Sequence, residues 1–278
     1  MKVQEGKFKG HKELPLYYCK WLPDRSPKAV FLFCHGATLH SGFYTNMAVH
    51  LTERGFAVYA PDLRGHGKSE GPRCYMARFE DYLLDLQQFV DQVKREQPGR
   101  KIFLGGHSMG SYIEGIYTCK HQDEIAGLMM ASAGIIGSTL GVPKVIIAMA
   151  GLVSAVAPRL GVNRLNVAGF SRDQAIVDAY INDPLVYHGR MPARWGAEML
   201  KMLKELPSQM REVRIPVLIM HGTGDWWNMP DGSREVYNLI ASSDKTLKLY
   251  DGLYHDIFNE PEKIKVMDDL VEWLQARL

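Results

Sequence analysis

The chain has 278 residues, of which 46% are hydrophobic and 23% charged, and its formal net charge is +2 at pH 7. This length suits one large domain or a core with an inserted subdomain, and the composition excludes an intrinsically disordered chain. Because the net charge is close to zero, we do not expect nucleic acid as a partner.

The cysteines and the N-terminal segment indicate whether the protein binds a metal and where in the cell it is located. The four cysteines form no C-x-x-C pair and no cluster with zinc-ligand spacing, so we expect free buried thiols and no metal site. Residues 1–11 include several lysines but lack the apolar stretch of a signal peptide. No run reaches the roughly 18 apolar residues of a membrane span. The expectation is a soluble, cytoplasmic protein.

Six short apolar runs predict buried strands. They cover residues 29–34, 57–61, 101–105, 127–132, 216–221 and 247–250. Most of these runs are continuous, as in parallel strands that are buried on both faces. Apolar residues at helical spacing predict one helix over 79–93, ended by Gln97-Pro98-Gly99, and another over 264–278. Such alternation of strands and helices predicts a doubly wound α/β sheet.

One long stretch breaks this alternation. Between residue 134 and about residue 214 there is no clear strand, and Gly and Pro divide the pattern into short helices. We therefore expect a core formed by 1–133 and 212–278, with 134–211 as a helical insertion over the sheet. Within it, 145–157 is almost wholly apolar but too short to span a bilayer. This segment fits either a packed helix or a lid face that contacts lipid or lines an acyl pocket.

A G-x-S-x-G motif directly follows one of the predicted strands. It reads Gly106-His107-Ser108-Met109-Gly110, and a helical pattern comes after it. Between a strand and a helix, such a serine lies on a sharp turn, for which the flanking glycines leave room. The turn raises the hydroxyl above the sheet edge at a helix N-terminus. The motif alone is loose, but this context predicts that Ser108 is a nucleophile.

A serine hydroxyl needs a base beside it, and in this strand–turn–helix context the order along the chain is serine, acid, histidine. Asp225 follows the predicted strand 216–221, and His255 follows 247–250. Both lie at the carboxyl ends of strands, where open α/β sheets build their sites. We predict that His255 takes and returns the serine proton and that Asp225 orients the imidazole. Asp231 is a weaker candidate for the acid, because it falls where the next helix should begin.

The negative charge that develops on an attacked carbonyl oxygen needs preorganised donors. The backbone N–H of Met109, directly after the nucleophile, is one candidate. The N–H of Ala37 is the other, because it follows an early strand. We interpret His35, His66 and His107 as structural. The glycine-rich loop around His66 lacks a phosphate-binding pattern.

Several further segments belong to no general ester chemistry. They are His35-Gly36 with His40-Ser41-Gly42, DLRGHGKSEG at 62–71, DPLVYHGR at 183–190, HGTGD at 221–225 with Gly232-Ser233-Arg234, and YHDIFNEPE at 254–262. With GHSMG, these segments resemble the monoglyceride lipase (monoacylglycerol lipase) and lysophospholipase branch of the α/β-hydrolases over about 10–277.

The resemblance implies an α/β-hydrolase fold, a mostly parallel doubly wound sheet with a helical cap inserted between two core strands. It also implies monoacylglycerol-like esters as substrates. It assigns the nucleophile, acid and base to Ser108, Asp225 and His255, in agreement with the chemistry above. The oxyanion donors that it implies are Ala37 and Met109.

The sequence departs from the family pattern at three places. Leu39 replaces the usual acidic residue of the HGxxEHSG stretch, Ser111-Tyr112 follows the motif where small residues are common, and Trp226-Trp227-Asn228-Met229 is bulkier than usual. None of these touches the three predicted catalytic residues. They bear on acyl length and glycerol preference. Trp226 and Trp227 either narrow the site or simply pack.

We therefore expect a serine esterase or lipase that forms an acyl-enzyme on a small ester or lipid substrate, most of all monoacylglycerols, without metal or cofactor. A lysophospholipase, thioesterase or peptidase is the alternative. A non-catalytic ligand-binding protein of the same fold is disfavoured by the complete set Ser108, Asp225 and His255. The serine also disfavours dehalogenases and epoxide hydrolases, which use an aspartate. The segment 145–157 leaves open contact with a lipid surface and a homo-oligomer.

Overall fold

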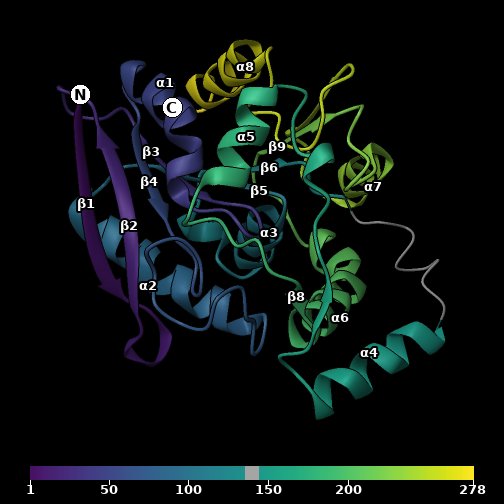
Figure 1. Ribbon diagram of the computed structural model, residues 1–278. Helices are drawn as coiled ribbons and strands as arrows, with labels where there is room; N and C mark the ends of the chain where they lie inside the picture. The colour runs from purple at the N-terminus through teal and green to yellow at the C-terminus, as the bar shows by residue number, and fades with distance from the viewer. Residues whose placement is uncertain (135–143) are drawn as a thin grey trace.

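A computed structural model describes residues 1–134 and 144–278, with the backbone alone at 144–148. Eight strands form one sheet in the order β1-β2-β4-β3-β5-β6-β9-β10 (Figure 1). The strands are β1 Lys2–Lys9, β2 Pro15–Leu22, β3 Val30–Cys34, β4 Ala57–Pro61, β5 Ile102–His107, β6 Gly127–Ala131, β9 Val217–Gly222 and β10 Lys245–Tyr250. From β4 to β10 all neighbours are parallel, whereas β2 pairs antiparallel with both β1 and β4. The sheet is therefore mostly parallel.

The six predicted strands are confirmed, with ends that differ by one or two residues. The hairpin of β1 and β2 was not predicted from the sequence. Strand β1 is largely exposed and presents Lys2, Glu5, Lys7 and Lys9 at one edge of the sheet. An exposed edge strand of this kind has no continuous apolar run, and only its pairing with β2 makes it recognisable.

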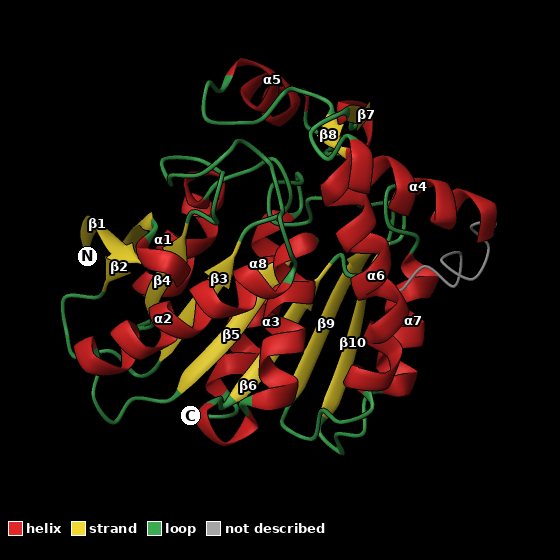
Figure 2. Ribbon diagram, turned by 90° about the horizontal axis from the view of Figure 1, so that it is seen from below, coloured by secondary structure: helices red, strands yellow, loops and turns green. Residues whose placement is uncertain are grey.

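Helices cover both faces of the sheet, which completes the doubly wound arrangement (Figure 2). The core helices are α1 Thr45–Glu53, α2 Glu80–Glu96, α3 Met109–Lys120, α7 Pro230–Leu239 and α8 Lys263–Gln275. Short 3-10 helices lie at His11–Glu13, Ser41–Tyr44, Gln122–Glu124 and Val167–Gly169. Apolar side chains of α2, α3 and α7 pack into one core layer, and those of α1 and α8 pack into the other. Both helical patterns predicted from the sequence are confirmed as α2 and α8.

The chain between β6 and β9 forms a separate group of elements. They are α4 Lys144–Val156, β7 Gly161–Asn163, α5 Gln174–Asn182, β8 Met191–Pro192 and α6 Ala193–Met210. Strands β7 and β8 pair as a small antiparallel sheet, so the expectation of no strand in this stretch was wrong. Pieces of three and two residues are too short to leave a sequence pattern. Residues 135–143, at the start of the expected insertion, lie outside the described residues.

The two ends of this group are packed differently. On α6, Leu206 and Met210 are fully buried in the core layer that contains α3. On α4, which lies at the outer side of α6 in Figure 1, the side chains of Met149, Leu152 and Val156 are exposed. The side chains of 145–148 lie outside the described residues. Within the described chain, no helix is both long and apolar enough to cross a bilayer.

The burial of α6 predicts a stability difference between two leucines. Leu206→Ala should lower the free energy of unfolding by about 2–5 kcal/mol, because it leaves a cavity in the core. Leu152→Ala is the matched control, since this side chain is 67% exposed and its loss should change stability by less than about 0.5 kcal/mol. Urea unfolding of both variants measures the difference. Equal effects would show that α6 does not belong to the core.

Candidate active site

Ser108 lies on the turn between β5 and α3 with φ 53° and ψ −116°. This left-handed region is strained for an L residue, and such strain persists only where the surroundings impose it. A Cβ on Gly110 would lie 2.1 Å from the carbonyl oxygen of Cys34, and one on Gly106 would lie 2.3 Å from the carbonyl carbon of Gly110. Gly110 is therefore required for α3 to approach the end of β3, and Gly106 is required for the tight turn between β5 and α3.

Asp225 and His255 meet at the carboxyl ends of β9 and β10. His255 Nδ1–H donates to Asp225 Oδ2 at 2.7 Å, and both residues are 2% exposed. The other oxygen of the carboxylate, Oδ1, accepts the backbone N–H groups of Trp227 at 2.8 Å and Asn228 at 3.0 Å. These bonds fix the carboxylate so that one oxygen faces the imidazole.

His221 is a part of this arrangement that was not predicted from the sequence. Its Nε2 lies 3.0 Å from Asp225 Oδ2 and 2.8 Å from the carbonyl oxygen of Asn228. Because both neighbours are acceptors, Nε2 carries a proton. Burial raises the pKa of Asp225, but the bonds and charges of His255 and His221 lower it by a larger amount. The resulting pKa lies well below the usual range of an aspartate. The carboxylate therefore stays ionised beside His255.

Ser108 and His255 line one cavity of about 460 Å³. Most of the residues that line it are apolar, and several of them belong to α6. The apolar lining residues include Leu39, Tyr112, Leu165, Phe170, Trp195, Met199, Leu200, Leu203 and Trp227. Apolar walls of this kind suit an apolar ligand, and Ser108 is among the few polar residues that line them.

The two predicted oxyanion donors also line this cavity. Met109 is the first residue of α3, and the first N–H groups of a helix have no acceptor within it. Ala37 follows β3 and directly precedes Thr38, whose φ is 68°. The structure thus brings all five predicted site residues to the same end of the sheet.

Three buried histidines near the site have other contacts. Burial lowers the pKa of His35, His66 and His107 to about 3 in each case, so these side chains are neutral. His35 Nε2 accepts from Leu63 N–H at 2.9 Å, and His107 Nε2–H donates to the carbonyl oxygen of His255 at 3.0 Å. These bonds connect loops, which is the structural role expected from the sequence.

The structure also shows where Asp231, the alternative candidate for the acid, and the pair Trp226 and Trp227 lie. Asp231 lies in the first turn of α7 with its side chain 87% exposed, whereas His255 is buried. Trp226 is exposed. The ring of Trp227 lies 4.9 Å from that of His255, lines the cavity and donates through Nε1 to the carbonyl oxygen of Asn166 at 3.0 Å. Trp227 therefore both packs and limits the space beside His255.

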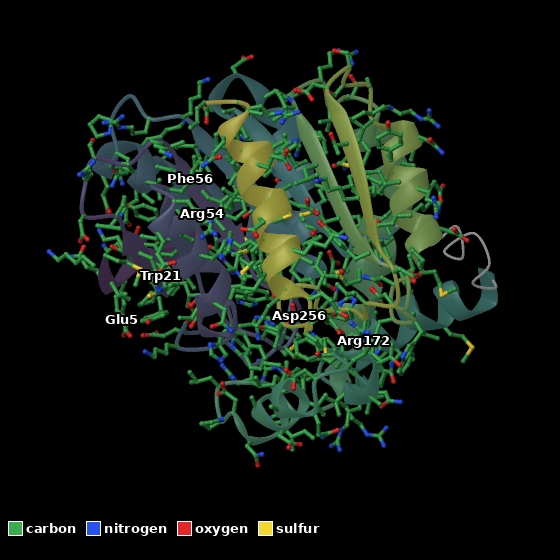
Figure 3. The ribbon with its side chains drawn as sticks, turned by 90° about the horizontal axis from the view of Figure 1, so that it is seen from above. Glu5, Trp21, Arg54, Phe56, Arg172 and Asp256 are labelled. Atoms are coloured by element: carbon green, nitrogen blue, oxygen red, sulfur yellow. The ribbon has the colours of Figure 1, made fainter. Side chains whose placement is uncertain are left out.

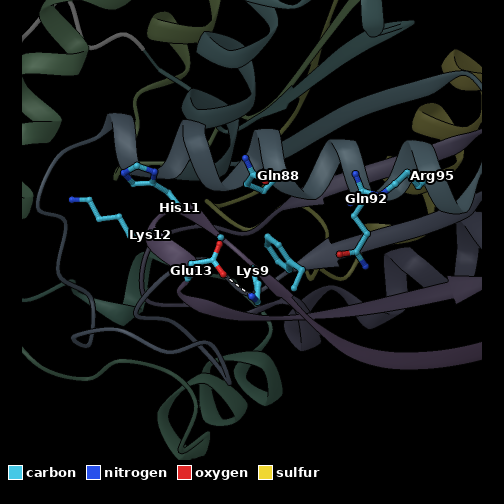
Figure 4. Close-up of a pocket in the computed structure, with 9 residues that line it drawn as sticks. Lys9, His11, Lys12, Glu13, Gln88, Gln92 and Arg95 are labelled. Atoms are coloured by element: carbon cyan, nitrogen blue, oxygen red, sulfur yellow. Dashed lines mark hydrogen bonds and ion pairs between the residues drawn. The ribbon is translucent and has the colours of Figure 1, made fainter.

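A second hollow of about 430 Å³ lies between β1 and α2 (Figure 4). Its lining is mainly polar and charged, with Lys9, His11 and Lys12 on one side and Gln88 and Arg95 on the other. It contains none of the predicted site residues. The cavity at Ser108 is therefore the candidate active site.

Comparisons with known proteins agree with this geometry. A family model described as serine aminopeptidase, S33, matches residues 25–262. A monoacylglycerol lipase of Mycolicibacterium smegmatis is 33% identical over 99% of this chain and 98% of its own length. The chain belongs to this α/β-hydrolase family. The enzyme is a carboxylic ester hydrolase, as the sequence predicts.

Two solved structures have the same fold as the hydrolase. A Paleococcus ferrophilus monoacylglycerol lipase superimposes with a TM-score of 0.84 at 29% identity, covering 95% of this chain and 99% of that one. A soluble variant of the Saccharomyces cerevisiae monoglyceride lipase, in complex with a substrate analog, gives 0.85 at 26% identity, covering 99% and 94%. The predicted α/β-hydrolase fold is confirmed.

Asp256, next to His255 in the hydrolase, predicts a pH dependence of stability. The residue is fully buried, and burial raises its pKa to about 6 although Asn259 donates to it. Because the folded state holds this proton more tightly than the unfolded chain, its stabilising contribution is complete below about pH 4. The contribution is lost as the pH rises through about 6, at a cost of roughly 3 kcal/mol.

In Asp256→Asn this loss should be absent. The unfolding free energy of wild type relative to the variant should therefore fall by roughly 3 kcal/mol between about pH 4 and pH 7, measured by urea unfolding at each pH. Asp178→Asn is the control, because Asp178 is exposed and its variant should follow wild type. A constant difference between wild type and Asp256→Asn across this range would contradict the assignment.

Proposed function

We propose that the enzyme hydrolyses monoacylglycerols through Ser108, His255 and Asp225. The observation that carries the proposal is the buried pair of Asp225 and His255, joined at 2.7 Å, in the cavity that the strained Ser108 also lines. Because the ionised carboxylate binds Nδ1–H, Nε2 is the ring nitrogen that would accept the serine proton. This is the arrangement that activates a hydroxyl for acyl transfer.

The reaction follows from these positions. His255 removes the Ser108 proton as Oγ attacks the ester carbonyl carbon, and the N–H groups of Ala37 and Met109 bind the oxyanion that forms. His255 then returns the proton to the leaving alcohol, which departs and leaves an acyl-enzyme. A water molecule, deprotonated by the same imidazole, attacks this ester and releases the fatty acid and Ser108.

The walls of the cavity support an acyl chain with an uncharged alcohol. Among the described residues that line it, there is no Asp or Glu for the ammonium group of a peptide N-terminus and no Lys or Arg for a phosphate. A buried charge without such a partner is costly. Although the family description mentions aminopeptidases, the lining thus favours monoacylglycerols over peptides and lysophospholipids.

The insertion 134–211 is proposed to act as the cap of this cavity. Side chains of α6, among them Trp195 and Met199, form part of the wall that faces Ser108. The exposed Met149, Leu152 and Val156 on α4 favour contact of the cap with a lipid surface. A homo-oligomer and a cytoplasmic location stay predictions from the sequence.

Ser108→Ala tests the proposal. For wild type, we expect efficient hydrolysis of 1-monoacylglycerols, with kcat/KM higher than for lysophospholipids or aminoacyl amides of matched acyl length. Ser108→Ala should lower kcat by roughly 10⁴-fold or more, because the nucleophile is removed. Ser242→Ala is the control, since this hydroxyl bonds to Asp244 away from the cavity.

The outcomes separate substrate from mechanism. If p-nitrophenyl esters are cleaved and monoacylglycerols are not, the substrate assignment fails and the mechanism stands. Wild-type activity in Ser108→Ala would overturn the mechanism.

A pair of aspartate variants tests the acid. Asp225→Asn should lower kcat by roughly 10⁴-fold, because the amide no longer stabilises the protonated His255. Asp231→Asn should leave kcat unchanged, since this side chain is exposed on α7. Steady-state kinetics on a soluble short-chain ester measure both. The reverse order of effects would transfer the acid role to Asp231.

A further inference from the structure

One segment of the insertion is bonded to two separate loops of the candidate active site. It comprises residues 169–187, which include α5, and we name it the brace. We propose that the brace fixes two loops relative to each other, with Arg172 and Tyr180 as positioning residues. They are the histidine loop, residues 251–262 between β10 and α8, and the oxyanion loop, residues 35–40 after β3. The proposal rests on the function proposed above and adds two residues that form no hydrogen bond with the Asp225 carboxylate; Tyr180 also lines the cavity of Ser108.

On the histidine side, the contacts begin with the backbone. His255 N–H donates to the carbonyl oxygen of Gly169 at 3.3 Å, and Asp256 N–H donates to that of Phe170 at 2.9 Å. Ser171 Oγ–H donates to the carbonyl oxygen of Asn259 at 3.2 Å. The chain on both sides of the imidazole is therefore bonded to the brace.

Arg172 adds a charged contact at the same place. Its Nε–H donates to Glu260 Oε2 at 2.7 Å, and its backbone N–H donates to Oε1 at 2.9 Å. Oε1 also accepts the N–H of Tyr254, the residue before His255, at 3.1 Å. Glu260 is fully buried, and Figure 3 shows Arg172 beside the segment that carries Asp256. One buried carboxylate thus joins the brace to the histidine loop.

On the oxyanion side, the brace binds Thr38. Thr38 Oγ1–H donates to the carbonyl oxygen of Ala37 at 2.5 Å, so the hydroxyl of Tyr180 donates to Thr38 Oγ1 at 2.8 Å. The N–H of Tyr187 donates to the carbonyl oxygen of Thr38 at 3.0 Å. Thr38 has φ 68°, a strained conformation for a β-branched residue that needs support from its surroundings. The brace supplies that support directly after the predicted oxyanion donor.

The catalytic base and one oxyanion donor belong to loops that are distant in sequence. Acyl transfer requires both to be placed within a fraction of an ångström, and a misplacement of about 1 Å can cost 100-fold in rate. A single segment bonded to both loops restricts their motion relative to each other. Weakening the contact of the brace with either loop should therefore lower kcat, with a smaller effect on KM.

The test compares Arg172→Leu and Tyr180→Phe with wild type, using active-site-titrated enzyme at a temperature where unfolding curves show each variant to be folded. We expect kcat to fall by up to about 100-fold in Arg172→Leu and by roughly 10-fold in Tyr180→Phe, with little change in KM. The rate at which a small fluorophosphonate labels Ser108 should fall in parallel, because labelling needs the base and the oxyanion donors but not the acyl cavity. Arg172→Lys should recover most of the loss, since an ammonium group still pairs with Glu260.

Two variants outside the brace are controls for the loss of an ion pair and of a tyrosine hydroxyl. Arg277→Leu removes another arginine–carboxylate pair, with Asp244, and Tyr59→Phe removes another buried tyrosine hydroxyl, which bonds to Glu96. Both should keep wild-type kcat and labelling rate. If Arg172→Leu does not fold, Tyr180→Phe decides, because it removes a single oxygen atom.

Wild-type kcat and labelling rates in the folded brace variants would overturn the proposal. So would a loss confined to thermal stability or to KM. These results are distinct from failure of the proposed function, which Ser108→Ala detects separately.

Discussion

The site depends on one close approach between backbones. Gly110, at the start of α3, packs against the carbonyl oxygen of Cys34 at the end of β3, at a distance that no side chain would permit. The chain reaches this contact through the left-handed turn at Ser108. Met109, between Ser108 and Gly110, lines the same cavity as Ala37. A steric constraint thus fixes the turn that carries the proposed nucleophile, next to one proposed oxyanion donor, before any polar interaction is considered.

The polar interactions then orient His255, the proposed base, from several directions. Asp225 binds the imidazole of His255 directly, while His221 and two backbone N–H groups hold the carboxylate. From the interior, His107 binds the carbonyl oxygen of His255, and from the insertion the brace binds its N–H. Such a supporting set matters because a catalytic group is effective only within a narrow range of geometry.

Much of this arrangement was predictable from the sequence, and the remainder was not for a physical reason. Buried parallel strands leave continuous apolar runs, and the loops at their carboxyl ends carry Ser108, Asp225 and His255, so order and position were visible locally. The pairing of Arg172 with Glu260 was not visible, because it joins segments distant in sequence that show no shared period. His221 was also missed, since its role depends on the carboxylate conformation. Strand β1 and the burial of α6 were also not predictable. Strand β1 is recognisable only by its pairing with β2, and α6 is buried only by its packing against the core.

The open sheet of this enzyme has two edge strands, β1 and β10, and their side chains affect whether two molecules can associate by strand pairing. An unpaired strand edge can template a strand from another chain, and charged side chains along it oppose that pairing. Strand β1 exposes three lysines and a glutamate, and β10 carries Lys245 and Lys248. The two lysines of β10 are bound by the carbonyl oxygens of Tyr237 and Ile240 and by Asp269, so the opposition to pairing is strongest at β1. Copies that associate are therefore expected to do so through surfaces other than the β1 edge.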